Sequence, residues 1–300
     1  MLYLNIARNK EDFILNGEEK YPKFIKKILC FFRKFTGQVL EVEIEGKNIV
    51  VISKINKKTY KKLDKIFKID VTKNICISEY FYENKEFLNY LKSKNLNIIN
   101  GRWLFKYLVF YISKFICNKL NLNSEMQEIS LLVNEPNFLV VDTIKKLSNE
   151  FKNINIITTQ IRKFEKLEKE LFDENGSILN VTNNFKKACL KSKIVFNYDL
   201  EDRIFSKIVL MPTAIIISLD KDIEIKQSNF KGKIIDFYSI NLPGKYKKIY
   251  DKLNTFNSSI LYESFIYKKT SHQNIWNEIE NDNIEILLLE NNNRVVTFNN

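Results

Sequence analysis

Polar side chains able to bind a ligand recur between residues 128 and 220, and each group directly follows a short apolar run. Amide, hydroxyl and guanidinium groups of this kind hydrogen-bond the phosphates and ribose hydroxyls of nucleotides. The residues concerned are Asn134, Glu135, Thr158, Thr159, Arg162, Thr182, Asn183 and Asn197. The corresponding positions after later runs hold Tyr198, Asp199, Ser218 and Asp220. If the apolar runs are parallel strands, these side chains lie at one edge of a sheet, where open α/β sheets bind ligands.

The apolar runs have the length of strands and alternate with polar, helix-like segments. They cover residues 129–133, 154–157, 178–181, 194–196 and 214–219. Strands that alternate with helices predict βαβ units and a parallel sheet. The expected fold class is therefore α/β, with a Rossmann-like parallel sheet.

The turn after the first run lacks the glycines that a dinucleotide site needs there. Glycine at this turn lets the backbone approach a pyrophosphate. The turn instead reads Asn134, Glu135, Pro136 and Asn137. Side chains at these positions keep the backbone away from a pyrophosphate, and the Glu135 carboxylate repels it. The sequence thus predicts a Rossmann-like sheet without the usual mode of dinucleotide binding.

Two segments resemble the nicotinamide-dinucleotide domain of the shikimate dehydrogenase and glutamyl-tRNA reductase group. Residues 158–162, Thr-Thr-Gln-Ile-Arg, are similar to that family's polar segment ending in Arg after the second strand. Residues 193–199 are similar to its buried strand that ends in Asn. The resemblance implies that Arg162 reads the 2′-phosphate of NADP, that Asn197 lies near the nicotinamide, and that a cleft separates two domains. The glycine-free turn departs from the family, and the N-terminal half shows no match to its catalytic Lys and Asp motifs.

The N-terminal half predicts a separate α/β domain. Strands are expected at residues 2–6, 39–44, 48–52, 75–78 and 97–99, and helices at 22–35, 57–68 and 85–91. Gly46, between the second and third of these strands, is typical of a β-hairpin.

A strongly apolar helix is expected over residues 102–120, after Gly101. It is apolar on most faces, which predicts burial on several sides. A helix that joins two domains explains this pattern, as would a dimer interface or an anchor in the plane of a membrane. Lys106 and Lys114 interrupt the helix, which disfavours a membrane span.

Positive charge is concentrated in the first half of the chain. Residues 1–127 hold 24 Lys and Arg against 13 Asp and Glu, whereas residues 128–300 hold 24 against 23. Lysines spaced by four, three, four and three residues would line one stripe of a helix extended to include the first of them. They are Lys54, Lys58, Lys61, Lys65 and Lys68. Such a stripe fits a membrane surface, a nucleic acid or an acidic protein, and an ordinary solvated helix face also explains it.

Several classes of function find no support in the sequence. The four cysteines are scattered and His272 is the one histidine, so neither a metal site nor a Cys–His nucleophile is indicated. No P-loop, metalloprotease helix or GxSxG motif occurs. The first residues lack a basic leader before an apolar segment, and no charge-free run of 18 residues occurs. A cytoplasmic protein with reduced thiols and no transmembrane span is therefore expected.

We expect three segments along the chain. Residues 1–122 form a basic α/β domain ending in the apolar helix, residues 128–241 a Rossmann-like domain, and residues 242–300 a helical segment that returns towards the junction. The function indicated is a degenerate Rossmann-like protein whose interdomain cleft holds a small or nucleotide-derived ligand. One alternative is a binding or scaffold module that docks through its basic half. The second alternative is an active NADP-dependent oxidoreductase, although no residue stands out as a general acid or base.

Overall fold

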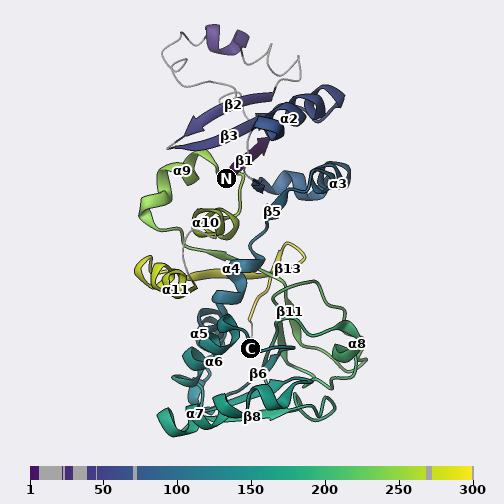
Figure 1. The fold of residues 1–300 in the computed structure, drawn as a ribbon, viewed down its shortest axis with the longest axis vertical. Coiled ribbons are helices and arrows are strands. Elements are labelled where there is room, and N and C mark those ends of the chain that lie inside the picture. Colours follow the sequence, from purple (N-terminus) through teal and green to yellow (C-terminus); the bar gives the residue numbers. More distant parts are fainter. Residues whose placement is uncertain are drawn as a thin grey trace. The chain divides into compact units, whose positions relative to one another are not determined.

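The computed structural model describes residues 1–6, 22, 24–29, 39–44, 46–69, 73–267 and 272–298. They form two compact units (Figure 1): the first comprises Met1–Asn100 and Leu242–Tyr267, and the second Gly101–Asn241 and Lys268–Asn300. This division differs from the expected segments, because the apolar stretch after Gly101 falls in the second unit and the C-terminal segment is shared. Of the helix expected over residues 22–35, residues 24–29 are helical, and residues 23 and 30–35 lie outside the described residues.

The first unit is built on a five-stranded sheet with the order β2-β3-β1-β4-β5. The central strand β1 (Leu2–Ile6) pairs in parallel with β3 (Lys47–Ile52) on one side and with β4 (Asn74–Ile77) on the other. β5 (Asn97–Ile99) extends the parallel sheet beyond β4. β2 (Val39–Ile44) is antiparallel to β3, which confirms the predicted hairpin.

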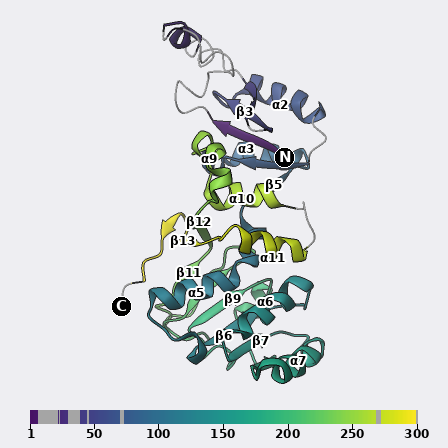
Figure 2. The same cartoon turned by 90° about the vertical axis from the view of Figure 1, so that its left-hand side faces the viewer.

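Helices cover both faces of this sheet. Because successive residues of a strand point to opposite faces, Leu2 and Leu4 of β1 lie on one face and Tyr3 on the other. The first two belong to the core that α2 (Lys57–Ile69) and α3 (Lys85–Ser93) share with the sheet. Tyr3 faces α10 (Ser258–Ile266), and its hydroxyl is 3.0 Å from Ser264 Oγ. Helix α10 lies next to β5 in Figure 2. All residues of α10 are buried.

Helix α2 begins at Lys57, so the expected extension of this helix to Lys54 is wrong. The Asn56 side chain explains the start, because its Oδ1 accepts the backbone N–H groups of Lys58 and Thr59 at 2.9 and 3.0 Å. An Asn at this position satisfies donors that the first helical turn leaves unpaired. Lys54 therefore precedes the helix, although its side chain is exposed like those of the lysines within it.

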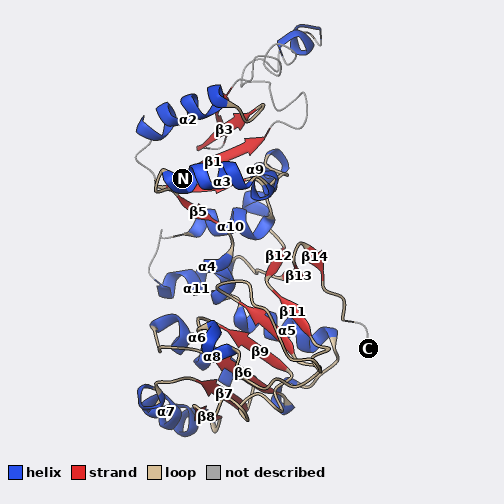
Figure 3. Ribbon diagram, turned by 90° about the vertical axis from the view of Figure 1, so that its right-hand side faces the viewer, coloured by secondary structure: helices blue, strands red, loops and turns tan. Residues whose placement is uncertain are grey.

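The second unit contains a six-stranded, all-parallel sheet with the order β11-β10-β9-β6-β7-β8 (Figure 3). Its strands are β6 (Glu128–Leu132), β7 (Asn153–Ile157), β8 (Ile178–Thr182), β9 (Ile194–Asn197), β10 (Ile215–Ser218) and β11 (Lys233–Ile235). Parallel strands buried on both faces read as continuous apolar runs, as β6, β9 and β10 do. Five of the six strands were predicted from the sequence, including the edge strand β8, which is partly exposed. The Rossmann-like α/β fold class is confirmed.

The two faces of this sheet are covered differently. The expected alternation of strands and helices is present from β6 to β8 and absent from most of the chain between β8 and β11. α6 (Phe138–Ser148) joins β6 to β7, and α7 (Glu165–Asn175) joins β7 to β8. After β8, the connections contain one short helix, α8 (Asp202–Phe205). Apolar residues of the irregular segments pack on the sheet in place of helices, among them Phe185, Leu200, Ile208 and Leu210. Figure 1 shows α6 and α7 on one side of the sheet and α8 on the other.

The apolar stretch after Gly101 forms two helices instead of the expected single one. α4 (Arg102–Tyr107) ends at Leu108, and α5 (Val109–Lys119) begins immediately after it. The burial predicted for this stretch is present, because both helices contribute side chains to the core. Among the described residues, no helix is long and apolar enough to cross a membrane.

The C-terminal segment contains strands as well as the expected helices. α9 (Lys247–Lys252) and α10 belong to the first unit, and α11 (His272–Asn281) to the second. β13 (Ile286–Asn291) pairs in antiparallel fashion with β12 (Phe237–Ile240) and β14 (Arg294–Val295). The chain thus closes the second unit with a small sheet of its own.

Candidate functional site

The strand order of the second unit determines where a ligand would meet its large sheet. Numbered along the chain from β6, the order is third, second, first, fourth, fifth, sixth, which is that of dinucleotide-binding Rossmann sheets. In such sheets the ligand crevice lies at the carboxyl ends of the strands where the order reverses. This point lies between β6 and β9, where Asn134 and Asp199 follow the strand ends.

Asn134 and Asp199 bind each other across this point. The backbone N–H of Asn134 donates to Asp199 Oδ1 at 2.7 Å, and the Asn134 side-chain amide donates to the Asp199 carbonyl oxygen at 3.0 Å. Burial raises the pKa of the Asp199 carboxyl, and the hydrogen bond from Asn134 and the charge of Lys106 oppose that rise. The Asp199 carboxylate is therefore bound to a backbone N–H of this turn. In a dinucleotide site the N–H groups of the corresponding turn bind phosphate.

Glu135 connects the same turn to the segment after β7. Its Oε1 accepts Gln160 Nε2 and Lys163 Nζ, both at 3.1 Å. These contacts hold the pKa of Glu135 below its usual value. Thr158 completes the link, because its hydroxyl donates to the Asn134 carbonyl oxygen at 3.2 Å and accepts the backbone N–H of Gln160. The structure thus brings Asn134, Glu135 and Thr158 together in one hydrogen-bonded corner.

The N-terminus of α6, which follows this turn, is capped by a side chain. Asn137 Oδ1 accepts the backbone N–H of Val140 at 3.0 Å. In a dinucleotide site a phosphate oxygen binds donors of this kind at the start of the first helix. The donor bound by Asn137 is therefore already satisfied within the protein.

Asn197 is buried at the end of β9 and stabilises the turn that follows. Its Oδ1 accepts the backbone N–H of Leu200 at 3.1 Å. Asn side chains commonly form turns of this type with the backbone two or three residues ahead. The position predicted to lie near a nicotinamide thus has a local structural partner.

The other predicted residues lie further along the same edge. Thr159 and Asn183 are exposed after β7 and β8, and Thr182 Oγ1 accepts the backbone N–H of Asn184 at 3.0 Å. Arg162 lies in the short 3₁₀ helix Ile161–Lys163 with its side chain exposed. Within the described part of the chain, none of the four forms a side-chain hydrogen bond or ion pair with the corner around Asn134.

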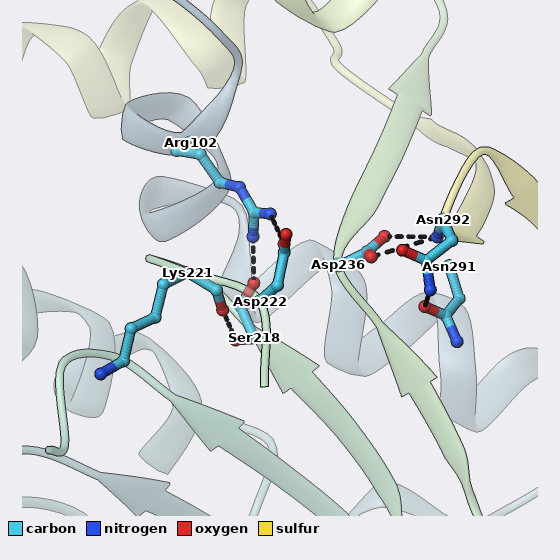
Figure 4. A network of polar contacts seen from close by, with 7 residues as sticks. All are labelled: Arg102, Ser218, Lys221, Asp222, Asp236, Asn291 and Asn292. Carbon is cyan, nitrogen blue, oxygen red and sulfur yellow. Dashed lines mark hydrogen bonds and ion pairs between the residues drawn. The ribbon is translucent and has the colours of Figure 1, made fainter. Parts of the chain in front are cut away.

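Two basic residues of α4 complete the edge, although their positions in the sequence give little indication of it. Arg102 donates from Nη1 to the Ser218 carbonyl oxygen and from Nη2 to Asp222 Oδ1, both at 2.7 Å (Figure 4). Lys106 Nζ lies 2.6 Å from Asp220 Oδ1. Both contacts are made at the end of β10. The lysine that interrupts the apolar stretch was the one sequence signal for them.

Asp236, directly after β11, adds a further carboxylate. Its two oxygens accept the backbone N–H of Asn292 at 3.1 and 3.2 Å, as Figure 4 shows. Burial raises the pKa of the Asp236 carboxyl, and the charge of Arg102 opposes that rise. This aspartate therefore ties the large sheet to the turn between β13 and β14.

The edge as a whole is rich in carboxylates that already have partners. Glu135, Asp199, Asp220, Asp222 and Asp236 each accept a hydrogen bond from the protein. No group of three metal-binding side chains was found among the described residues. Glu135, Asp220 and Asp222 are paired with Lys163, Lys106 and Arg102, so the chemistry offered at this edge is mainly hydrogen-bond acceptance.

No protein-family model matches the chain, and no curated protein matches it in sequence. Among solved structures, the chain is similar to ornithine transcarbamoylase from Giardia lamblia, with 8% sequence identity and a TM-score of 0.34. The match covers 90% of this chain and 86% of the transcarbamoylase chain. It is also similar to shikimate 5-dehydrogenase from Listeria monocytogenes, with 8% sequence identity and a TM-score of 0.28. That match covers 72% of this chain and 77% of the dehydrogenase chain. Δ1-pyrroline-2-carboxylate reductase from Thermococcus litoralis shares 10% identity and a TM-score of 0.26; 38% of this chain matches 36% of that reductase. These are distant resemblances of α/β fold alone.

Proposed function

We propose that the second unit is a Rossmann-like domain that does not bind a dinucleotide through its first turn, and that the chain binds a small, phosphate-free ligand instead. The observation that carries this proposal is the bond from the Asn134 backbone N–H to Asp199 Oδ1 at 2.7 Å. A pyrophosphate at this point would have to displace a carboxylate of the protein from its donor. The displaced carboxylate would then face the phosphate as a like charge.

The acceptors at the strand ends support the same interpretation. Glu135, Asp220 and Asp222 remain substantially exposed, with 62%, 51% and 79% of their side chains accessible. Their ion pairs with Lys163, Lys106 and Arg102 engage those cations within the protein, while the exposed carboxylate oxygens can accept hydrogen bonds from a ligand with amino groups or other donors. The proposed ligand therefore carries donors and no phosphate.

The alternative, an NADP-dependent oxidoreductase, rests on the roles implied for Arg162 and Asn197. Arg162 is exposed, which leaves it available to a 2′-phosphate. The Asn197 amide oxygen is bonded to Leu200, however, and the Asn134 N–H to Asp199. Dinucleotide binding would require these local bonds to be exchanged for bonds to the cofactor.

A thermal-shift panel on the full chain tests the proposal. The panel contains NAD, NADH, NADP, NADPH, ATP and S-adenosylmethionine, together with phosphate-free amino acids and amines. A ligand at a hundred times its dissociation constant adds about 2.7 kcal/mol to the unfolding free energy, enough to move the melting temperature by several degrees. We expect no shift with the dinucleotides and a shift with an amine or amino acid that Asp222→Asn reduces.

A clear shift with NADPH would overturn the proposal in favour of the oxidoreductase. In that case Arg162→Ala should weaken binding of NADPH more than that of NADH, because only the former carries a 2′-phosphate. Lys187→Ala, a charge loss at another exposed position of the second unit, is the matched control.

A further inference from the structure

Helix α2 of the first unit presents lysines over one broad face. We call this set the lysine face: Lys57, Lys58, Lys61, Lys62, Lys65 and Lys68, all exposed, with exposed Lys54 just before the helix. At 100° of rotation per residue, the six within the helix fall on an arc of about 140°. The arrangement includes the predicted stripe and is wider than it.

The opposite side of α2 holds the helix firmly on the sheet. Leu63 and Ile66 belong to the core of the first unit. Tyr60 packs against Tyr90 of α3, with ring centroids 4.5 Å apart. The lysine face is therefore displayed by a helix whose orientation within its unit is set by packing.

The single acidic residue of α2, Asp64, lies at the border of the lysine face, and its carboxylate is bound by residues of a neighbouring segment. Asp64 lies 2.7 Å from Lys94 Nζ and accepts the Tyr90 hydroxyl at 2.8 Å, both from the neighbouring α3 segment. These contacts hold the pKa of Asp64 below its usual value, so the residue is ionised and its charge is paired with Lys94. Within α2 this one carboxylate stands against the six lysines of the lysine face, so the face keeps a large net positive charge.

The shape of this surface favours a linear polyanion. A helix of 13 residues is about 20 Å long, and duplex DNA carries a negative charge about every 1.7 Å along its axis. Lysines repeating at each turn can therefore meet several phosphates at once. An amphipathic helix that lies in a membrane needs an exposed apolar side, and the apolar side of α2 is covered by the core of its own unit.

We propose that the lysine face of α2 binds the phosphate backbone of a nucleic acid. Binding of this kind is independent of base sequence and is driven by the release of counterions, so it weakens steeply with salt. The surface belongs to the first unit and is separate from the strand ends considered above for a small ligand.

The test is fluorescence anisotropy of the full chain with a fluorescein-labelled 30-base-pair duplex between 50 and 200 mM salt. Six phosphate contacts predict a loss of affinity of about two thousandfold over this range. Lys58→Gln/Lys61→Gln/Lys65→Gln should bind more weakly at 50 mM salt. Its loss over the same range should fall to roughly fortyfold, since each contact contributes about 0.9 to the logarithmic salt slope.

The matched control is Lys186→Gln/Lys187→Gln/Lys191→Gln, which removes the same charge from exposed positions in the second unit. It should bind DNA as the wild type does, and equal melting temperatures should show that both variants are folded. The proposal is overturned if the wild type fails to bind the duplex at 50 mM salt, or if both triple variants lose affinity equally. It is also overturned if the face variant loses binding to phosphatidylserine vesicles but keeps its affinity for DNA.

Discussion

The Asp199 carboxylate binds the backbone N–H of Asn134 at 2.7 Å, and the Asn134 amide returns a bond to the Asp199 carbonyl oxygen. The two residues follow the neighbouring parallel strands β6 and β9, at the point where the strand order reverses. A polar pair of the protein thus stands where a Rossmann sheet receives its cofactor. A ligand phosphate at this position would therefore compete with the Asp199 carboxylate for the Asn134 N–H.

Asp199→Ala should destabilise the protein by about 1–3 kcal/mol, because it leaves the partly buried Asn134 N–H without its acceptor. Asp199→Asn retains a side-chain oxygen and should cost clearly less. Urea denaturation of both variants measures the difference. Equal stability of the two variants would show that the hydrogen bond to Asn134 contributes little.

Asp236 should make stability depend on pH. Its folded-state pKa is raised by burial, so between the unfolded pKa near 4 and the folded value the native state binds more protons than the unfolded state. The contribution of Asp236 is therefore fully present below this window and is lost as pH rises through the folded pKa. Unfolding free energies of wild type and Asp236→Asn, compared from pH 3.5 to 7, should show the wild type losing stability relative to the variant. A constant difference across this range would contradict the assignment.

Arg102 should matter more for stability than its ion-pair partner. Asp222 is largely exposed, and exposed ion pairs contribute at most about 1 kcal/mol, so Asp222→Asn should change stability by less than about 0.5 kcal/mol. Arg102→Ala also removes the bond to the partly buried Ser218 carbonyl oxygen and should cost about 1–3 kcal/mol. Thermal denaturation of the two variants distinguishes these effects. A larger loss of stability in Asp222→Asn than in Arg102→Ala would contradict this ranking of the two residues.

Much of the fold could be predicted because the main strands are buried and therefore apolar along their length. β11 could not, since its three residues begin with a lysine and form no apolar run of strand length. The irregular segments after β8 place Ile208 and Leu210 in the core without a helical repeat, so the spacing of these residues carries no signal. The break between α4 and α5 at Leu108 also carries no sequence signal, because no glycine or proline lies there.

The candidate site could be predicted only in part, for a related reason. Strand ends are visible in the sequence, and they led directly to Asn134, Glu135 and Thr158. The contacts of Arg102 with Ser218 and of Lys106 with Asp220 span 116 and 114 residues. Local sequence patterns contain no information about pairs so far apart. Asn197 was found by position, but its bond to Leu200 depends on a turn geometry that the sequence leaves open.

Gly232 and Gly244 should respond oppositely to the same substitution. A Cβ at Gly232 would lie 2.0 Å from the Ala214 carbonyl oxygen, a backbone atom next to β10, so Gly232→Ala should cost about 1–3 kcal/mol. No atom lies within 4 Å of the corresponding Cβ at Gly244, and Gly244→Ala should be neutral or slightly stabilising. Equal melting temperatures would show that the chain around Gly232 relaxes without cost.

Asn197 separates a structural from a cofactor-binding role at the end of β9. Asn197→Ala removes the acceptor of the buried Leu200 N–H and should cost about 1–3 kcal/mol, whereas Asn197→Ser, whose hydroxyl can form a weaker turn of the same kind, should recover part of the loss. Chemical denaturation measures both variants, and titration with NADPH is the second readout. If Asn197 serves the turn alone, neither variant changes the response to NADPH. A variant that keeps wild-type stability but alters NADPH binding would instead indicate that the Asn197 amide contacts the nicotinamide of a bound cofactor.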